Sequence, residues 1–170
     1  PYPEINKIVQ NRYLEKNFIN SIGIKTTKFS LIKKHNDLIN NKELLPGILK
    51  TSTLGYDGKG QFKINSINDI SKLNVDFRKE YILEKIINLK KEISVVITRF
   101  KKNTFQIYEP IENIHKDQIL KKSKIPAKID KSIFEQSISW AKEISEKLNF
   151  IGTMCVEFFI DNNNALYVNE

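Results

Sequence analysis

Residues 47–61 read Gly-Ile-Leu-Lys-Thr-Ser-Thr-Leu-Gly-Tyr-Asp-Gly-Lys-Gly-Gln, a strand-like run followed by a loop with three of the chain's six glycines. Glycine this dense lets the backbone bend sharply or approach another group closely. Such a loop can wrap amide N–H groups around a polyphosphate, and Lys50 and Lys59 add positive charge. It is not a Walker P-loop, because no helix follows a GxxxxGK[ST] pattern. An ordinary hairpin loop is the alternative.

The flanking residues predict short strands and two longer helices. Apolar residues recur at helical spacing over residues 4–22, and Gly23 stands where a C-terminal cap is expected. A second helix is predicted over residues 130–148 with Asp130 as its N-cap. Strands are predicted at residues 27–32, 47–51, 61–64, 81–86, 93–101, 104–108, 118–123, 151–160 and 165–169, short helices between the first two strands and at 66–73, and a turn-rich crossing at 110–116.

Hairpins combined with two packing helices favour the α+β class over a doubly wound parallel sheet. A length of 170 residues suits one domain or two small lobes. The chain begins at Pro1 without Met and stops at Glu170 within an apparent strand. We therefore expect it to be a piece of a longer protein, truncated at both ends.

The composition narrows the possible partners. The net charge is +8, but only 3 of the 28 basic residues are Arg, the residue on which specific readers of nucleic acid rely most. We therefore expect no nucleic-acid partner, although a basic nucleic-acid-binding module stays the rival from another class. No apolar run reaches the roughly 20 residues of a membrane span, so no membrane partner is expected. The single cysteine favours a reducing compartment and a cytoplasmic location.

Two carboxylates, Glu84 and Glu92, lie eight residues apart around a predicted strand end. A strand edge with backbone groups and an acidic side chain suits the edge of an adenine ring, and a second carboxylate suits ribose hydroxyls. The alternative is an ordinary salt bridge between Glu92 and one of the many lysines.

A second acidic pair, Glu157 and Glu170, lies on the terminal hairpin. If Asn163 and Asn164 form a two-residue turn, Glu157 stands directly opposite Glu170, where two carboxylates repel. Mg²⁺ would relieve the repulsion, because it accepts carboxylate and phosphate oxygens together. A three-residue turn would instead place Asn169 opposite Glu157 and weaken the metal argument.

Taken together, the motifs resemble one family over nearly the whole chain. The most specific is Gly55-Tyr56-Asp57-Gly58-Lys59-Gly60-Gln61, preceded by Ile48-Leu49-Lys50-Thr51. The other motifs are Ile8-Val9-Gln10-Asn11-Arg12, Lys16-Asn17-Phe18, Gly23-Ile24-Lys25-Thr26, Glu112-Asn113-Ile114-His115-Lys116-Asp117, Val156-Glu157-Phe158-Phe159 and Val168-Asn169-Glu170. This set resembles the ATP-grasp ligases and, among them, the N5-carboxyaminoimidazole ribonucleotide synthetases.

The resemblance implies an ATP-grasp fold with two lobes of antiparallel sheet. Residues 1–83 would form the small lobe with the N-terminal helix and a glycine-rich lid, and residues 84–170 a larger lobe, incomplete at its C-terminus. Family regions that contact substrate and bicarbonate are missing from both ends, so we expect this chain to be inactive alone.

The resemblance also implies roles for individual residues. Arg12, Lys50 and Lys59 would be catalytic, Arg12 and Lys50 would contact ATP phosphates, and Glu157 and Glu170 would ligate Mg²⁺. The nucleotide-binding residues would be Arg12, Lys50, the lid residues Gly55, Tyr56, Asp57, Gly58, Lys59, Gly60 and Gln61, the adenine hinge Glu84, Lys85, Ile86 and Ile87, the ribose ligand Glu92, and His115, Asn169 and Glu170.

The implied reaction joins bicarbonate to 5-aminoimidazole ribonucleotide at the expense of ATP, in purine biosynthesis, through carboxyphosphate. The implied partners are these small molecules, and the full-length enzyme would be a homodimer. Another ATP-grasp carboxylase or a carboxylate–amine ligase is the alternative within enzymes, and a non-catalytic ATP-binding protein is a further one.

Overall fold

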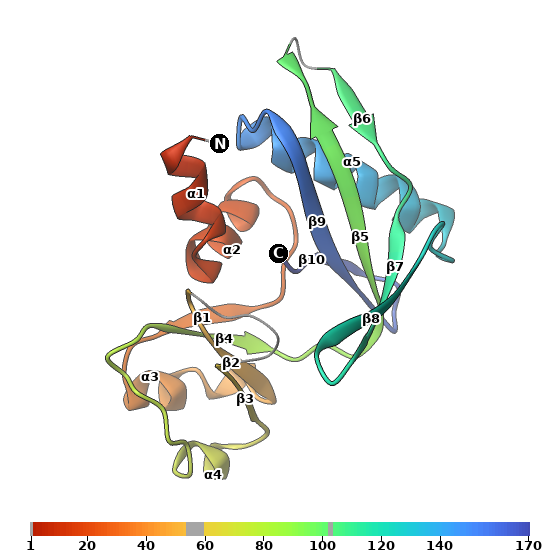
Figure 1. Cartoon of the computed structure of the whole chain (residues 1–170). Coiled ribbons are helices and arrows are strands. Elements are labelled where there is room, and N and C mark those ends of the chain that lie inside the picture. Colours follow the sequence, from red (N-terminus) through yellow and green to blue (C-terminus); the bar gives the residue numbers. More distant parts are fainter. Residues whose placement is uncertain (1, 54–59, 102–103) are drawn as a thin grey trace.

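The computed structural model describes residues 2–53, 60–101 and 104–170 and has two lobes, each built on its own sheet (Figure 1). The smaller lobe has four antiparallel strands in the order β1-β4-β2-β3, with short helices packed on them. Its elements are β1 (Phe29–Ile32), α3 (His35–Asn40), the 3-10 helix η1 (Lys42–Leu44), β2 (Gly47–Thr51), β3 (Gln61–Ile64), α4 (Ile67–Ile70) and β4 (Tyr81–Lys85).

The larger lobe has a six-stranded sheet in the order β10-β9-β5-β7-β8, with β6 also paired to β5. All its strand pairs are antiparallel, so the predicted α+β class is confirmed. Its elements are β5 (Leu89–Arg99), β6 (Phe105–Ile107), β7 (Ile111–Lys116), β8 (Ile119–Lys124), α5 (Lys131–Lys147), β9 (Gly152–Asp161) and β10 (Leu166–Val168).

Each lobe has its own apolar core. In the larger lobe, alternate residues of β5 and β9 point toward α5, which covers one face of the sheet (Figure 1). This period of two follows from the pleat of a strand. The buried side chains are Ile93, Val95, Ile97, Val156, Phe158 and Ile160 from the strands, Ile133, Ala141, Ile144 and Leu148 from the helical side, and Ile32, Leu38, Leu49, Ile64, Ile70 and Leu83 in the smaller lobe.

The predicted single helix over residues 4–22 is wrong, because two helices, α1 (Pro3–Val9) and α2 (Arg12–Ser21), occupy this stretch. The break falls at Asn11, whose side-chain oxygen accepts hydrogen bonds from the N–H groups of Tyr13 and Leu14 and so caps α2. The apolar spacing continues across the break, which is why periodicity alone does not detect it.

The predicted C-terminal cap at Gly23 is confirmed. Gly23 has a φ of +77°, and the N–H groups of Gly23 and Ile24 donate to the carbonyls of Asn20 and Ile19. These two bonds form a Schellman motif, in which glycine avoids the cost of a left-handed backbone. The chain then turns toward the strands.

The N-terminal helices pack on the larger lobe, although the sequence assigned them to the smaller one. Ile19 and Ile24 belong to the core that α5 shares with β5 and β9, and Ile8 and Phe18 pack against it. The two sheets separate between Lys85 and Leu89, close to the predicted boundary at residues 83 and 84. The boundary itself stays a prediction.

The predicted turn-rich crossing at residues 110–116 is wrong, because Ile111–Lys116 forms strand β7. Glu112 and Asn113 pair with Ile93 and Glu92 of β5 on one side and with β8 on the other. These polar residues are half-buried in the sheet. Because they are polar, the segment lacks the apolar alternation by which a strand is predicted from sequence.

The terminal hairpin has a three-residue turn, so the two-residue turn at Asn163 and Asn164 is wrong. Leu166 pairs with Ile160, and the same register brings Ala165 opposite Asp161. The carboxylate of Asp161 accepts hydrogen bonds from the N–H groups of Asn163 and Ala165, at 2.9 and 2.8 Å, while Asn164 has a φ of +61°. This turn is the three-residue alternative that the sequence argument left open, and the Asp161 side chain stabilises it.

We expect Asp161→Ala to lower the free energy of unfolding by about 1–3 kcal/mol at pH 7, because two backbone donors lose a charged acceptor. The hydrogen bond from Ala165, with that from Asn163, holds the pKa of Asp161 below its ordinary value. The ionised carboxylate therefore stabilises the fold above the unfolded-state pKa, and this contribution disappears as the pH falls through the lower folded-state pKa. Denaturant unfolding at pH 7 and pH 3 would measure it.

Asn162→Ala is the matched control, since Asn162 lies exposed in the same turn. Equal stability of Asp161→Ala and Asn162→Ala at pH 7 would contradict the role given to Asp161.

Candidate functional site

A cleft of about 560 Å³ contains most of the residues that the sequence singled out. Its walls come from both lobes, with β2 and β4 on one side and β5, β7, β9 and the chain after β10 on the other. The lining residues predicted from the sequence are Arg12, Lys50, Gln61, Glu84, Lys85, Ile86, Ile87, Glu92, His115, Glu157, Asn169 and Glu170, and Thr27, Ile48, Leu89, Gln118 and Phe159 line it as well.

The predicted lid is described only in part. Gly55, Tyr56, Asp57, Gly58 and Lys59 lie outside the described residues. Gly60 has a φ of +74°, and a side chain there would also meet that of Thr51. Gly60 accepts a hydrogen bond from the N–H of Thr51, so the returning strand starts beside the end of β2.

Glu84 lies on β4 between β1 and β2, so it is not at the strand edge that the sequence suggested. The residue is 4% exposed, and its carboxylate lies 3.1 Å from the Lys50 Nζ atom and 3.4 Å from the Lys16 Nζ atom. Burial alone would raise the pKa of Glu84, but the two ammonium groups outweigh it and hold this pKa below its ordinary value. The carboxylate is therefore ionised and forms ion pairs with both lysines.

Lys16 is a further residue beside the cleft to which the sequence argument assigned no role. It appeared there only within a family motif, and its helical spacing resembles that of any surface lysine. The side chain is 2% exposed, and it reaches the hydroxyls of Thr26 and Thr27 and the carbonyl of Asn169. Lys16 lies three positions before Ile19, the other buried residue of α2, but this spacing alone does not distinguish it from a surface lysine.

Glu157 and Glu170 are neighbours even though the predicted register is wrong. The N–H of Glu157 donates to the Glu170 carbonyl at 2.7 Å, and its carbonyl accepts from the N–H of Asn169 at 2.8 Å. Asn169 therefore stands opposite Glu157, and one further residue brings Glu170 beside it. Burial and the nearby Glu170 carboxylate raise the pKa of Glu157 above its ordinary value.

This pair could hold a divalent cation. Burial and the Glu170 carboxylate raise the cost of ionising Glu157, and a hard cation bound by both carboxylates would offset that cost. Among the described residues, no group of three or more His, Cys, Asp or Glu side chains is placed to hold a metal ion. The remaining ligands of such an ion would therefore have to come from a bound molecule or water.

A basic residue closes the acidic end of the cleft. The Arg12 guanidinium donates to the Glu170 carboxylate at 2.7 Å. Arg12 begins α2, and its own N–H donates to the carbonyl of Ser52, near the end of β2. The start of α2 is thus attached both to the smaller lobe and to the acidic pair.

Glu92 and His115 form a third polar pair in the cleft. The Nδ1 atom of His115 lies 2.8 Å from the Glu92 carboxylate, and the two residues stand on the adjacent strands β5 and β7. Burial raises the pKa of Glu92 above its ordinary value, and His115 opposes that effect. Two polar groups that face a shared space in this way can bind hydroxyl groups.

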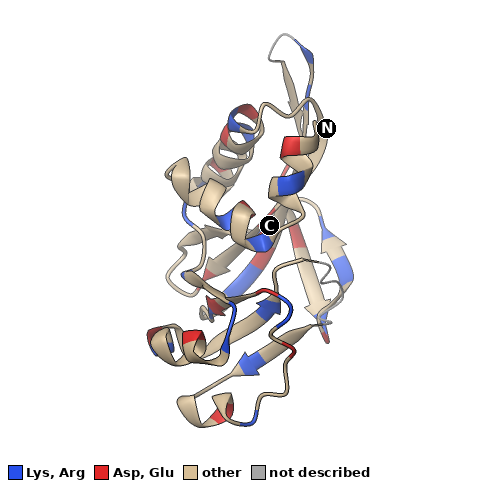
Figure 2. Cartoon of the chain, turned by 90° about the vertical axis from the view of Figure 1, so that its left-hand side faces the viewer, with Lys and Arg blue, Asp and Glu red and all other residues tan. Residues whose placement is uncertain are grey.

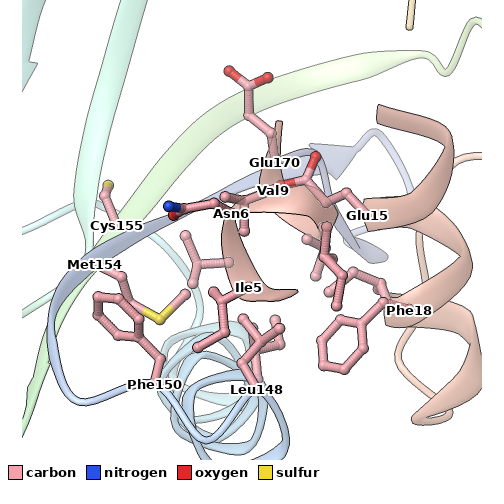
Figure 3. A pocket seen from close by; sticks show the side chains of 15 residues that line it. Ile5, Asn6, Val9, Glu15, Phe18, Leu148, Phe150, Met154, Cys155 and Glu170 are labelled. Carbon is pink, nitrogen blue, oxygen red and sulfur yellow. The ribbon is translucent and has the colours of Figure 1, made fainter. Parts of the chain in front are cut away.

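An apolar pocket of about 260 Å³ lies on the far side of Glu170 (Figure 3). Figure 3 shows Phe18, Leu148, Phe150 and Met154 around it and the carboxylates of Glu15 and Glu170 at one side. Burial and the Glu170 carboxylate raise the pKa of Glu15 to about 7. The pocket has no cationic lining residue among those described, so its chemistry differs from that of the cleft.

Charge is distributed over both lobes, with Lys and Arg interspersed among Asp and Glu (Figure 2). The cleft differs from this background because its charges are ordered, with Lys50 on β2 facing the same space as Glu157 on β9. Such a space suits a multiply charged anion that carries a divalent cation. In the described part of the chain, no helix is both long and apolar enough to span a membrane.

Comparisons with known proteins identify the family of the chain. The model of the ATP-grasp domain family matches residues 17–170. The N5-carboxyaminoimidazole ribonucleotide synthase of Staphylococcus aureus strain COL is 40% identical over 167 residues, covering 96% of this chain and 44% of the relative. The protein of the same name from Bacillus subtilis strain 168 is 35% identical over 170 residues, covering 98% and 45%.

The fold of the chain also resembles that of solved structures. The crystal structure of N5-carboxyaminoimidazole synthetase from Staphylococcus aureus complexed with ADP has a TM-score of 0.87 and 40% sequence identity. The similarity covers 96% of this chain and 44% of that one. The present chain therefore spans less than half the length of the relatives it matches.

We expect Glu84→Gln to lower the free energy of unfolding by about 3–5 kcal/mol at pH 7, because it leaves buried Lys16 without its counter-ion. Because the folded-state pKa of Glu84 is depressed, its stabilising contribution exists above the unfolded-state pKa and is lost as the pH falls through the folded-state pKa. The difference between wild type and variant should shrink in acid. Denaturant unfolding as a function of pH measures it.

Glu80→Gln provides the matched control, since Glu80 pairs with Lys33 on the surface. That variant should change stability by no more than about 1 kcal/mol. An equally small effect of Glu84→Gln would contradict the account of the buried pair.

Proposed function

Because the chain belongs to the ATP-grasp family, we propose that it is the nucleotide-binding part of an ATP-dependent ligase that carboxylates 5-aminoimidazole ribonucleotide. The observation that carries this proposal is the shared cleft, in which Lys50 of the smaller lobe and the Glu157–Glu170 pair of the larger lobe face one space. The names of the relatives from two bacteria support the choice of substrate. The whole reaction would take place in the cytoplasm, in a homodimer.

In this proposal the cleft binds ATP along its length. Residues 84–87 would hold adenine through backbone groups other than the N–H groups of Lys85 and Ile86, which donate to the carbonyls of Lys28 and Pro46. The Glu84 carboxylate already binds two lysines. Glu92 and His115 would accept ribose hydroxyls. Lys50, Arg12 and the lid of Gly55, Tyr56, Asp57, Gly58, Lys59, Gly60 and Gln61 would surround the phosphates.

The proposed reaction has two transfers. First, an oxygen of bicarbonate attacks the γ-phosphorus of ATP, the bond to ADP breaks, and carboxyphosphate forms. Second, the amine of 5-aminoimidazole ribonucleotide attacks the carboxyl carbon, phosphate leaves with the bonding electron pair, and the nitrogen loses a proton. Lys50 and Arg12 would offset the negative charge of the transferred group, and the lid would exclude the water that hydrolyses carboxyphosphate.

Mg²⁺ fits the acidic end of this cleft because Glu157 and Glu170 are backbone neighbours that both line it, and because burial and the Glu170 carboxylate raise the pKa of Glu157. The ion would neutralise charge between the phosphates of ATP. Glu157 and Glu170 would hold the ion, and Arg12, which binds Glu170 here, would bind a phosphate.

The proposed substrates are tested by measuring the release of phosphate from ATP by the full-length gene product. We expect release only when Mg²⁺, bicarbonate and 5-aminoimidazole ribonucleotide are all present, with N5-carboxyaminoimidazole ribonucleotide as product. If phosphate release requires bicarbonate but a different amine or acid in place of 5-aminoimidazole ribonucleotide, the chain would instead belong to another ATP-grasp carboxylase or to a carboxylate–amine ligase. Full turnover by the 170-residue chain alone would contradict the assignment of substrate contacts to other regions.

Lys50→Ala should weaken the binding of Mg·ATP to the chain by about 10- to 100-fold, since a charge-assisted contact to phosphate is lost. Isothermal titration with Mg·ATP and with adenosine measures this, and adenosine affinity should stay unchanged. Lys63→Ala, an exposed lysine on the neighbouring strand β3, is the control. Unchanged affinity for Mg·ATP in Lys50→Ala would count against the phosphate role.

Glu157→Gln should raise the Mg²⁺ concentration needed for half-maximal ATP hydrolysis by about tenfold or more, because a charged metal ligand is lost. The fold should persist, since the substitution removes one member of a repelling pair. Circular dichroism checks the fold, and a magnesium titration checks the role. Wild-type behaviour at low magnesium would refute it.

A further inference from the structure

The most deeply buried charge of the described chain belongs to Lys16, which does not line the cleft. It lies on α2, on the side of Glu84 away from the cleft, and the Glu84 carboxylate lies between Lys16 and Lys50. Three charges therefore lie in a row from the interior to the cleft, in the order plus, minus, plus. A buried charge is retained only where partners compensate it, so this arrangement needs an explanation.

The hydrogen-bond pattern favours the ammonium form of Lys16, although burial lowers the pKa of this side chain below its ordinary value. The Thr26 hydroxyl donates to the Val168 carbonyl at 2.7 Å, and the Thr27 hydroxyl donates to the Glu84 carboxylate at 3.1 Å. Neither hydroxyl has a second hydrogen, so both can only accept from Lys16, at 3.0 and 3.4 Å. The Asn169 carbonyl, at 3.1 Å, is also an acceptor. An ammonium supplies the three donors that these neighbours require.

Glu84 meets one cation on each oxygen. Its Oε1 atom faces Lys50 at 3.1 Å, whereas its Oε2 atom faces Lys16 at 3.4 Å and accepts from Thr27. The row of three carries a net charge of +1. Lys50 and Glu84 line the cleft, whereas Lys16 does not. The net positive charge of the row is therefore available to a ligand at Lys50.

We propose that Lys16 is a positioning residue that neutralises Glu84 from behind and thereby leaves the positive charge of Lys50 available to an anion in the cleft. Without Lys16, Glu84 and Lys50 would form a closed neutral pair, and the cleft would lose one net positive charge at its phosphate end. This inference deepens the proposed function and rests on it for the identity of the anion as the polyphosphate of ATP.

A purely structural role of Lys16 predicts something different. The same side chain joins α2 to the Asn169 carbonyl, so its loss could distort the cleft as a whole. A distorted cleft would bind adenosine and ATP equally poorly. A lost charge would reduce the binding of the polyphosphate alone.

The experiment compares Lys16→Met, Lys50→Met and the double variant Lys16→Met/Glu84→Gln by isothermal titration with Mg·ATP, adenosine and inorganic tripolyphosphate. Lys16→Met should weaken Mg·ATP and tripolyphosphate by about tenfold and change adenosine by no more than about twofold. The double variant, which also removes the Glu84 charge, should recover affinity to within about threefold of wild type. Lys90→Met, an exposed lysine outside the cleft, controls for the change in net charge.

The double variant also keeps the test available if Lys16→Met does not fold, because it buries no uncompensated charge. In that case the double variant is compared directly with wild type and with Lys50→Met, and tripolyphosphate affinity close to that of Lys50→Met would overturn the proposal. Equal losses for adenosine and Mg·ATP in Lys16→Met, with no recovery in the double variant, would overturn it too.

The two proposals fail in different ways. A wild-type chain that binds tripolyphosphate but no nucleotide would refute the proposed function, and the inference on Lys16 would then be judged on tripolyphosphate alone. A wild-type chain that binds Mg·ATP and a Lys16→Met variant that binds it equally well would refute only the role of Lys16.

Discussion

The carboxylate of Glu84, held between the ammonium groups of Lys16 and Lys50, is the interaction on which the cleft depends. It joins α2, β2 and β4, and through Lys16 it reaches the Asn169 carbonyl beside Glu170. Removing Glu84 leaves the buried Lys16 ammonium without its counter-ion, which is costly. The two lobes are therefore linked through the residues that also set the charge of the cleft.

This arrangement explains why the cleft has two electrically distinct ends. The β2 side carries the surplus positive charge of the Lys16–Glu84–Lys50 row, and the β9 side carries the repelling carboxylates Glu157 and Glu170. In the structure Arg12 offsets part of that repulsion by its bond to Glu170. A magnesium-bearing polyphosphate satisfies both ends at once, which a simple anion or a simple cation does not.

The sequence predicted the α+β class, most strands and the lining of the cleft, because these follow from alternating apolar residues and from recognisable motifs. It did not predict the break at Asn11, since capping acts through one side chain and leaves the apolar spacing intact. It left the two-residue and three-residue turns open, and the Asp161 carboxylate, which stabilises the three-residue turn, decides between them. The burial of Lys16 depends on residues far apart in the chain, so no local pattern reveals it.

The most direct test is a crystal structure of the chain with Mg²⁺ and a non-hydrolysable ATP analogue. We expect the phosphates to contact Lys50 and Arg12, the metal to lie between Glu157 and Glu170, and the Arg12–Glu170 bond to be broken. Glu84 should still contact both Lys16 and Lys50. A nucleotide bound elsewhere, or phosphates beyond hydrogen-bond reach of Lys50, would contradict the account.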